Sequence, residues 1–237
     1  MNEFSLQKFK MKRNYRLYSI TIFFVFLALC SGFNPVSGQD SVTDYDGNVY
    51  STVKIGTQLW MAENLKTTHY SDGESIPEIK DDSLWADLTT GAYCSSNNEK
   101  SNSELYGYLY NWYVVPNIKK VCPVGWHVPA ANDWKKLETY LGGPGTSGGK
   151  MKETGTGKWV DPGTKADNSS GFTGLPGGSR NPDGTFNIPG ESGQWWTSTE
   201  FSITTAWHRR LYNNVGFIDN IYALKTEGFS IRCLKDN

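Results

Sequence analysis

Side chains that could support metal chemistry are few in this 237-residue chain. Its three histidines, His69, His127 and His208, lie far apart and show none of the spacings that zinc ligands use. A solitary histidine more often serves as a structural hydrogen-bonding group than as a ligand. We therefore predict that none of the three holds a metal ion.

The sequence also lacks the motifs of common hydrolases and nucleotide-binding proteins. No G-x-S-x-G segment, which would place a nucleophilic serine on a sharp turn, occurs in the chain. The glycine-rich segment 142–150, GGPGTSGGK, is followed by no convincing helix, as a phosphate-binding loop would require. The acidic pair Asp81 and Asp82 lies in a polar stretch typical of a solvated turn. The sequence predicts no catalytic residue and no cofactor.

Two loops contain oxygen atoms that calcium could use as ligands. They are DPGTKADN at 161–168 and NPDG at 181–184. Asp, Asn, Pro and Gly also form ordinary turns, because their side chains cap the backbone or permit its tight geometry. Turn formation explains both loops without a metal, and we favour it.

The segment 106–113, YGYLYNWY, concentrates aromatic side chains in a short stretch. It is either a platform on which sugars or bases stack or a part of the hydrophobic core. On a strand, alternate residues from Tyr106 to Trp112 would share one face. The residue types alone leave these alternatives open.

The elements that would position these residues begin with two strands. Segments 48–56, NVYSTVKIG, and 58–64, QLWMAEN, read as a hairpin joined at Gly56 and Thr57, with Val49, Val53 and Ile55 on one face. A turn at Asp46-Gly47 precedes it. The sequence after this hairpin, 67–103, is polar and rich in turns, with Trp85 and Tyr93 expected to fill the core.

The clearest helix is ANDWKKLETYL at 131–141. Its apolar stripe repeats at helical spacing and consists of Trp134, Leu137, Tyr140 and Leu141. Asp133 suits the first turn, and Gly142-Gly143 provides a C-terminal stop. We expect this helix on the outside of a sheet.

The rest of the chain is expected to form loops and short strands. Residues 142–170 are dense in Gly, Pro, Ser and Thr and predict long ordered loops, which Met151 and Trp159 pack onto the core. Strands are predicted in the following six segments: FTGLPGG, GTFNI, GQWWTST, AWHRRLY, GFIDNIYALK and GFSIRCL. In the last of them, Phe229, Ile231 and Cys233 alternate with polar residues, which indicates a half-buried strand. The fold class is α+β.

The N-terminal region is typical of a secretory signal. Five basic residues precede an uncharged run at 17–30, which is short of the roughly 20 residues that cross a bilayer. Small residues at 36–38 predict cleavage between Gly38 and Gln39, so that 1–38 is a signal peptide. Leu29 before Cys30 disfavours lipidation, and a retained membrane anchor is the alternative.

The mature chain, 39–237, is one domain of about 200 residues with a lead-in at 39–44. It has 18 basic and 23 acidic residues, a net charge of −5. Nucleic-acid binding needs a basic surface, so this class is excluded. Three cysteines remain in an oxidising compartment, Cys94, Cys122 and Cys233, and we expect one pair and one odd thiol.

Six segments in order resemble one known family. They are DYDGNVYSTVKIGTQLWMAENLKT (44–67), LYGYLYNWYVV (105–115), CPVGWHVPAANDWKKLETYLGG (122–143), GFTGLPGGSRNPDGTF (171–186), WWTSTE (195–200) and GFSIRCLKD (228–236). Together they resemble the Fibrobacter succinogenes major paralogous domain, a family of exported bacterial proteins, over nearly the whole mature chain.

The resemblance implies a C-type-lectin-like fold for 45–237, which formylglycine-generating enzymes also use: short antiparallel strands, two main helices and long ordered loops. The segment 106–113 would be a helix packed on the sheet, so its rings belong to the core. Because the chain ends meet in this fold, the resemblance also implies a disulfide between Cys122 and Cys233, with Cys94 left over. Ala130 departs from the family's usual serine, which would cap the helix that follows.

The resemblance carries no reaction over to this chain. Formylglycine-generating enzymes use two cysteines that bind copper, and sugar-binding C-type lectins hold calcium with a Glu-Pro-Asn or Gln-Pro-Asp loop and a Trp-Asn-Asp strand. NPDG at 181–184 and WWTS at 195–198 match neither lectin motif. We expect an exported, non-catalytic module in the periplasm, on the cell surface or outside the cell, with a protein or glycan partner and no membrane span in the mature chain. An enzyme of the formylglycine-generating kind is the alternative.

Overall fold

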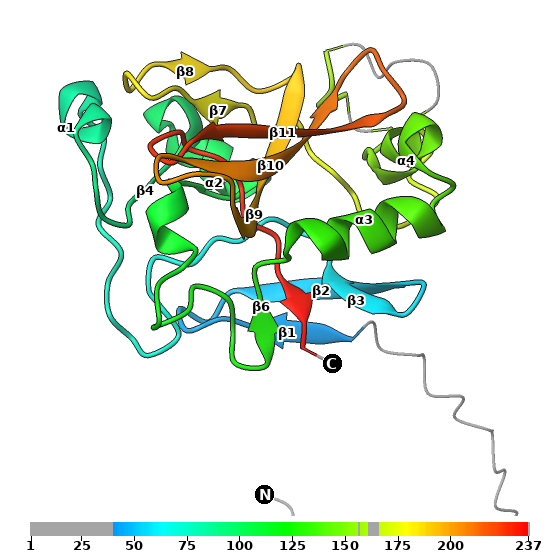
Figure 1. The fold of residues 1–237 in the computed structure, drawn as a ribbon, viewed down its shortest axis with the longest axis horizontal. Coiled ribbons are helices and arrows are strands. Elements are labelled where there is room, and N and C mark those ends of the chain that lie inside the picture. The colour runs from blue at the N-terminus through cyan, green and yellow to red at the C-terminus, as the bar shows by residue number, and fades with distance from the viewer. Residues whose placement is uncertain (1–39, 156, 161–165, 237) are drawn as a thin grey trace, which may run out of the picture. The chain divides into compact units, whose positions relative to one another are not determined.

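The computed structural model describes residues 40–155, 157–160 and 166–236 (Figure 1). The signal peptide predicted at 1–38, its cleavage site between Gly38 and Gln39, and the alternative of a retained anchor lie outside these residues. Within them, no helix has the length and apolar character needed to cross a membrane. Helices and mostly antiparallel sheets make the fold α+β, as the sequence predicts.

A five-stranded antiparallel sheet contains both the first and the last strand of the described chain. Its order is β1 (Ser41–Thr43), β2 (Val49–Ile55), β3 (Gln58–Met61), β12 (Leu234–Lys235) and β6 (Trp126–His127). The segment expected as a lead-in thus contributes β1. The β2–β3 hairpin is confirmed, because Ile55 pairs with Gln58 across Gly56 and Thr57. On the face predicted for Val49, Val53 and Ile55, burial increases along the strand: Val49 is 61% exposed, Val53 is half-buried and Ile55 is buried.

A three-stranded antiparallel sheet is formed by β9 (Ser192–Glu200), β10 (Thr205–Tyr212) and β11 (Ile218–Leu224), with β10 in the centre. These elements confirm three of the predicted late strands. Neighbouring residues of β9 point to opposite sides, and both sides are buried. Trp195 packs into one core cluster with Leu211, and Trp196 packs into another with Phe229. The sheet is therefore covered on both faces where these tryptophans lie.

The helix α3 (Ala131–Tyr140) joins the two sheets, as Figure 1 shows. The ring centroid of Trp134 is 4.9 Å from that of Trp60 on β3 and 6.3 Å from that of Trp195 on β9. The predicted helix and its buried stripe are confirmed, with one exception. Tyr140 is 67% exposed, because its ring lies over the β2–β3 turn, where a Cβ added to Gly56 would lie 2.9 Å from it.

Other residues compensate for the missing serine before α3. Ala130 has no capping side chain, but its backbone N–H donates to Asp133 Oδ2 at 3.1 Å. The N–H of Ala131 donates to Thr199 Oγ1 of β9 at 2.9 Å. These two bonds satisfy the N–H groups of the N-cap residue and of the first helical residue, and the N–H of Asp133 donates to the carbonyl of Ala130 at 2.9 Å. The helix start is thus held by the neighbouring sheet.

The helix predicted over 106–113 is wrong. The helix α2 (Lys100–Tyr106) ends at Gly107, whose φ of +79° is left-handed. A Cβ at position 107 would lie 2.8 Å from the carbonyl oxygen of Leu65, so only glycine fits there. The left-handed backbone of Gly107 ends the helix. Two short elements follow: β5 (Leu109–Tyr110), paired with β4 (Tyr93–Cys94), and a 3-10 turn, η2 (Trp112–Val114).

The rings of this aromatic segment nevertheless belong to the core, as expected. Tyr106, Tyr110 and Trp112 are all less than 9% exposed. The indole N–H of Trp112 donates to the carbonyl of Thr197 at 2.9 Å, and the Tyr110 hydroxyl donates to that of Thr67 at 2.6 Å. These three rings therefore fill the interior, whereas Tyr108 and Tyr113 are half-buried. Trp85 and Tyr93 are buried as well.

The prediction that 142–170 contains only loops is also wrong. The segment Pro144–Met151 forms the helix α4. Its glycines suppress the helical signal in the sequence, but Gly148 is needed because a Cβ there would lie 2.3 Å from the carbonyl oxygen of Phe217. Met151 and Trp159 are buried, which confirms that the region packs onto the core. Among the described residues, the two longest helices are thus α3 and α4.

Three of the six late strands are not formed as predicted. FTGLPGG at 172–178 is a buried loop, and GTFNI contributes only β8 (Phe186–Asn187), which pairs with β7 (Ser179–Arg180). The segment 228–234 is buried on both sides, with Ser230 at 2% and Arg232 at 0% exposure, so the half-buried strand is wrong. The polar positions face inward because this segment contacts both sheets through Trp195 and Met61. The remaining elements are α1 (Asp82–Ala86) and the 3-10 turn η1 (Ser96–Asn98).

Candidate functional site

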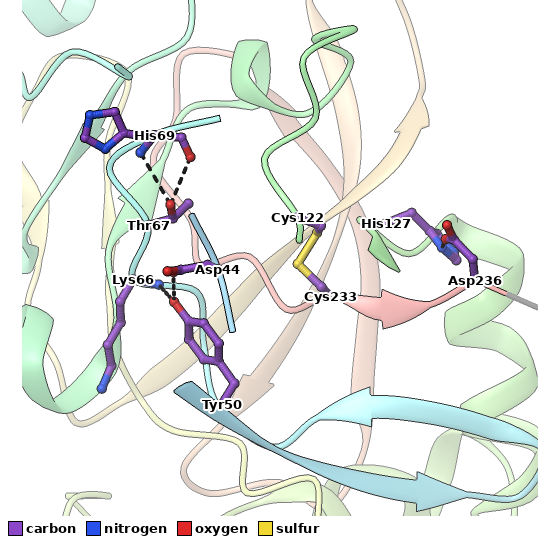
Figure 2. The surroundings of a disulfide bond; sticks show 9 residues. All are labelled: Asp44, Tyr50, Lys66, Thr67, His69, Cys122, His127, Cys233 and Asp236. Carbon is purple, nitrogen blue, oxygen red and sulfur yellow. Dashed lines mark hydrogen bonds and ion pairs between the residues drawn. A yellow bond between two sulfur atoms is a disulfide. The ribbon is translucent and has the colours of Figure 1, made fainter. Parts of the chain in front are cut away.

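The predicted disulfide is confirmed. Cys122 and Cys233 are bonded, with a Cα–Cα distance of 5.9 Å, and both side chains are buried (Figure 2). The bond links the segment before β6 to the segment before β12. These two strands are neighbours in the five-stranded sheet, so the bond reinforces the closure between the middle and the end of the chain.

Cys94 is the odd thiol among the described cysteines and is fully buried. Burial raises its pKa to about 12, although Arg180 nearby favours the thiolate. The thiol is therefore protonated at neutral pH and closed to solvent. It is a poor nucleophile and a poor metal ligand in this setting.

The histidines have different environments. His69 Nδ1 lies 2.5 Å from a carboxylate oxygen of Asp46, and His127 Nδ1 lies 2.6 Å from one of Asp236, which fits the expected structural role. Figure 2 shows the second of these pairs, His127 and Asp236. His208 departs from the expected role, because neither ring nitrogen has a hydrogen-bond partner in the described structure. Burial, and then the two neighbouring arginines, lower its pKa to about 3, so the ring is neutral.

No group of three or more His, Cys, Asp or Glu side chains in the described ranges could hold a metal ion. In the loop 181–184, Asp183 Oδ1 accepts hydrogen bonds from the backbone and hydroxyl of Thr185, at 3.0 and 2.7 Å. These are turn contacts, as the sequence indicates. Residues 161–165 of the other loop lie outside the described structure; Asp167 caps Ser169 in the same way.

The acidic pair has a structural role that the sequence did not reveal. Asp81 caps the N-terminus of α1 through Leu84 N–H, at 2.9 Å. Asp82 forms an ion pair with the buried guanidinium of Arg180, with Nη2 and Oδ1 2.8 Å apart. The pair is thus more than a solvated turn, because it anchors α1 to β7.

The first surface feature that could bind a partner is a group of three rings, Phe201, Trp207 and Tyr222, here called the aromatic cluster. Phe201 and Tyr222 stack with centroids 4.3 Å apart and planes 5° from parallel. Trp207 stands edge-on to both, at 5.1 and 5.9 Å. Phe201 is 50% and Tyr222 55% exposed. The rings are held close together; Phe201 and Tyr222 remain about half open to solvent, and Trp207 is half-buried.

The strands determine the arrangement of this cluster. Trp207 of β10 and Tyr222 of β11 are direct cross-strand partners, so their side chains lie on the same face. Phe201 begins the β9–β10 loop, where its N–H donates to the carbonyl of Thr205 at 3.0 Å. Lys225 ties the loop down, because its ammonium contacts Glu200 and donates to the carbonyl of Ile203 at 2.8 Å.

The second feature is a pocket of about 360 Å³, here called the Gln194 pocket. It is lined by Phe186, Asn187, Ile188, Glu191, Ser192, Gln194, Arg210 and Tyr212. Four of these residues form a square on one face of the β9–β10 pair. Gln194 pairs with Arg210, and Ser192 pairs with Tyr212. The alternation of strand residues places this square and Trp207 on opposite faces of the sheet.

The charged groups of the pocket are held in place. Arg210 donates from Nη2 to Asp219 Oδ2 of β11 at 3.0 Å, and its guanidinium lies 4.3 Å from the ring centroid of Tyr212. Glu191 forms no ion pair within the described structure. The pocket offers hydrogen bonds and one carboxylate, and no cysteine or histidine lines it.

Residues 53–235 match the Fibrobacter succinogenes major domain. The chain belongs to this family. No curated protein and no solved structure gives a significant match. The disulfide, the aromatic cluster and the Gln194 pocket all lie inside the matched part of this Fibrobacter succinogenes major domain.

Sequence reasoning missed both surface features of this Fibrobacter succinogenes major domain. AWHRRLY and GFIDNIYALK were recognised as strands, but a Trp or Tyr in a strand is usually read as a core residue. The available signal is alternation: Trp207 and Arg209 share one face of β10, whereas Arg210 and Tyr212 share the other. Which of these residues meet Tyr222, Ser192 or Gln194 depends on strand pairing, which no local pattern reveals.

Proposed function

We propose that this protein is an exported, non-catalytic binding module of C-type-lectin-like fold, which binds a protein or glycan partner through the aromatic cluster. The observation that carries the proposal is a group of three mutually packed rings on a sheet face, of which Phe201 and Tyr222 are exposed and Trp207 is half-buried. Large apolar side chains gathered on a surface are typical of binding sites, and aromatic residues dominate the energetics of such sites. Ile203 and Leu224, 88% and 43% exposed, extend the apolar surface.

The cluster is preorganised for binding. Its rings are fixed by their contacts with one another and by the strand register, and the loop that carries Phe201 is held by Lys225. The side chains of the cluster would therefore lose little conformational freedom when a partner binds. Each ring that a partner covers would remove roughly 150–250 Å² from water if it became fully buried, so even partial coverage is favourable.

The cysteines favour a binding module over the formylglycine-generating alternative. That chemistry needs a pair of reactive thiols. Cys122 and Cys233 are joined to each other, and Cys94 is buried with a raised pKa. The disulfide also supports export, because such bonds persist in oxidising compartments. The pairing of the last strand with β3, near the start of the domain, supports the lectin-like topology.

The proposal is tested with the protein purified after export. Binding to a panel of oligosaccharides and to purified cell-envelope proteins is measured for the wild type and for Trp207→Ala and Tyr222→Ala variants. We expect an identified partner whose affinity falls about tenfold or more in either variant. Ile118→Ala is the matched control, because Ile118 is a 92% exposed apolar residue that is not part of the cluster. A partner bound equally well by all variants would refute the role of the cluster, and copper-dependent thiol oxidation of a peptide would restore the enzyme alternative.

A further inference from the structure

The Gln194 pocket contains polar groups that the protein itself leaves unpaired. Gln194 is 7% and Ser192 8% exposed, so both are more than nine-tenths buried. Neither the amide of Gln194 nor the hydroxyl of Ser192 makes a hydrogen bond within the part of the chain that the structure describes. Their polar atoms are open to solvent at the pocket rather than fully enclosed. Both side chains line the pocket, so a ligand that enters it can pair with these groups.

The groups around these two residues alternate between donors and acceptors. The Gln194 amide offers two N–H donors and one carbonyl oxygen, and the Ser192 hydroxyl offers both functions. Arg210 adds N–H donors on one side, and the carboxylate of Glu191 adds acceptors on the other. A hydroxyl group donates one hydrogen bond and accepts others. A ligand with neighbouring hydroxyls would therefore satisfy such a mixed set, whereas a ligand with only donors or only acceptors would not.

The charges of the pocket argue against an ionic ligand. The guanidinium of Arg210 is already neutralised by Asp219, 3.0 Å away, and Glu191 adds a negative charge. A phosphate or carboxylate would meet a site that is negative overall. A divalent cation would meet a guanidinium and amide N–H donors where it needs oxygen atoms. The ligand that remains is neutral and hydroxylated.

We propose that the Gln194 pocket binds a neutral pyranose of an oligosaccharide. Its volume of about 360 Å³ falls in the range of small-molecule sites. Tyr212 and Ile188 supply apolar surface for the C–H groups of the sugar. A second hollow of about 500 Å³ shares Glu191 and Tyr212 with the pocket and continues to Asn213, Asn214 and Phe217. The neighbouring sugar of the oligosaccharide lies in this second hollow.

This inference rests on the proposed function in one respect, since it treats the domain as a binding module. It concerns the opposite face of the sheet, so the two sites are separable. The probes are neutral oligomers of glucose, xylose, mannose and N-acetylglucosamine, with oligogalacturonate and inorganic phosphate as charged probes. Affinities are measured by titration calorimetry on the exported protein. We expect a neutral oligomer to bind and the charged probes to show no binding.

Gln194→Leu keeps most of the side-chain volume and removes the amide, so we expect the affinity for this oligomer to fall about tenfold or more. Asn220→Ala is the matched control, since it removes an exposed amide from the other face of the same sheet and should leave the affinity unchanged. In case the leucine variant folds poorly, the side-chain amide resonance of Gln194 in the wild type provides a second readout. We expect it to shift on addition of the oligomer.

Three results would overturn the proposal: binding of the oligomer with unchanged affinity in Gln194→Leu, an unmoved Gln194 amide resonance at saturation, or binding of a charged probe at the pocket in place of the neutral ones. If no neutral oligomer binds at millimolar concentration while Trp207→Ala still loses its partner, the pocket proposal fails and the proposed function stands. If Trp207→Ala loses affinity for the oligomer and Gln194→Leu does not, the sugar site belongs to the aromatic cluster.

Discussion

Removing the Cys122–Cys233 disulfide should lower the stability of the domain by several kcal/mol. The bonded residues are 111 positions apart, so the crosslink closes nearly half of the chain into a loop in the unfolded state. Chain-entropy estimates for a loop of this length give about 4.8 kcal/mol at 25 °C. Both side chains are buried, and truncating them to alanine adds a small cavity cost. For a domain of this size the total corresponds to a fall in Tm on the order of 10–20 °C.

The free energy of unfolding of a Cys122→Ala/Cys233→Ala double variant is measured in urea, with tryptophan fluorescence as the signal. Cys94→Ala is the matched control, because it truncates a cysteine that is also buried but closes no loop. We expect the control to lose roughly 1 kcal/mol and the double variant to lose more than twice that amount. The wild type in reducing agent should lose about as much as the double variant. A double variant that loses no more than two independent truncations would refute the argument from loop closure.

Four further outcomes are expected. Asn64→Ala should lower the free energy of unfolding by about 3 kcal/mol, because Asn64 Oδ1 accepts hydrogen bonds from the fully buried guanidinium of Arg232 at 2.6 and 3.1 Å. Urea unfolding measures this loss, and a loss below about 1 kcal/mol would contradict the prediction. The pKa of His208 is lowered to about 3 in the folded protein, so its contribution to stability is present above pH 6.5 and is lost as the pH falls toward 3. Between pH 6.5 and about 4, the His208→Phe variant should therefore lose less stability than the wild type. Parallel profiles of stability against pH for the two proteins would contradict this prediction. Excess chelator should leave the Tm unchanged if 181–184 is only a turn, whereas a fall of several degrees would reveal a cation site. N-terminal sequencing of the exported protein should begin at Gln39, and a lipid-modified Cys30 would overturn that expectation.

The elements that the sequence predicted well are those whose signals are local. The β2–β3 hairpin depends on a two-residue turn at Gly56-Thr57, and α3 depends on the spacing of Trp134, Leu137 and Leu141. The errors occurred where distant contacts overrode local preference. Gly107 ends α2 because the backbone of Leu65 lies against it, and the glycines of α4 are tolerated because Phe217 packs closely on Gly148.

The cysteine pairing could be anticipated only through the family resemblance, since three cysteines permit several pairings. Burial decided the fate of the third: Cys94 is enclosed, and its pKa is raised for that reason. The polar residues Ser230 and Arg232 appeared to face solvent because they alternate with apolar neighbours. In the structure this segment contacts both sheets, and Asn64 supplies the hydrogen bonds that let an arginine remain buried.

By itself the sequence determined the family, the α+β class, one hairpin and one helix, because each follows from motif order or short-range periodicity. The core role of the aromatic segment was implied only by the family resemblance. The surface features required the tertiary structure. Trp207 meets Tyr222, and Gln194 meets Arg210, only through the register of β9, β10 and β11. A shift of one residue would turn every side chain of a strand to the other face. Strand pairing, which depends on residues far apart in the chain, therefore decided which residues form the aromatic cluster and which form the pocket.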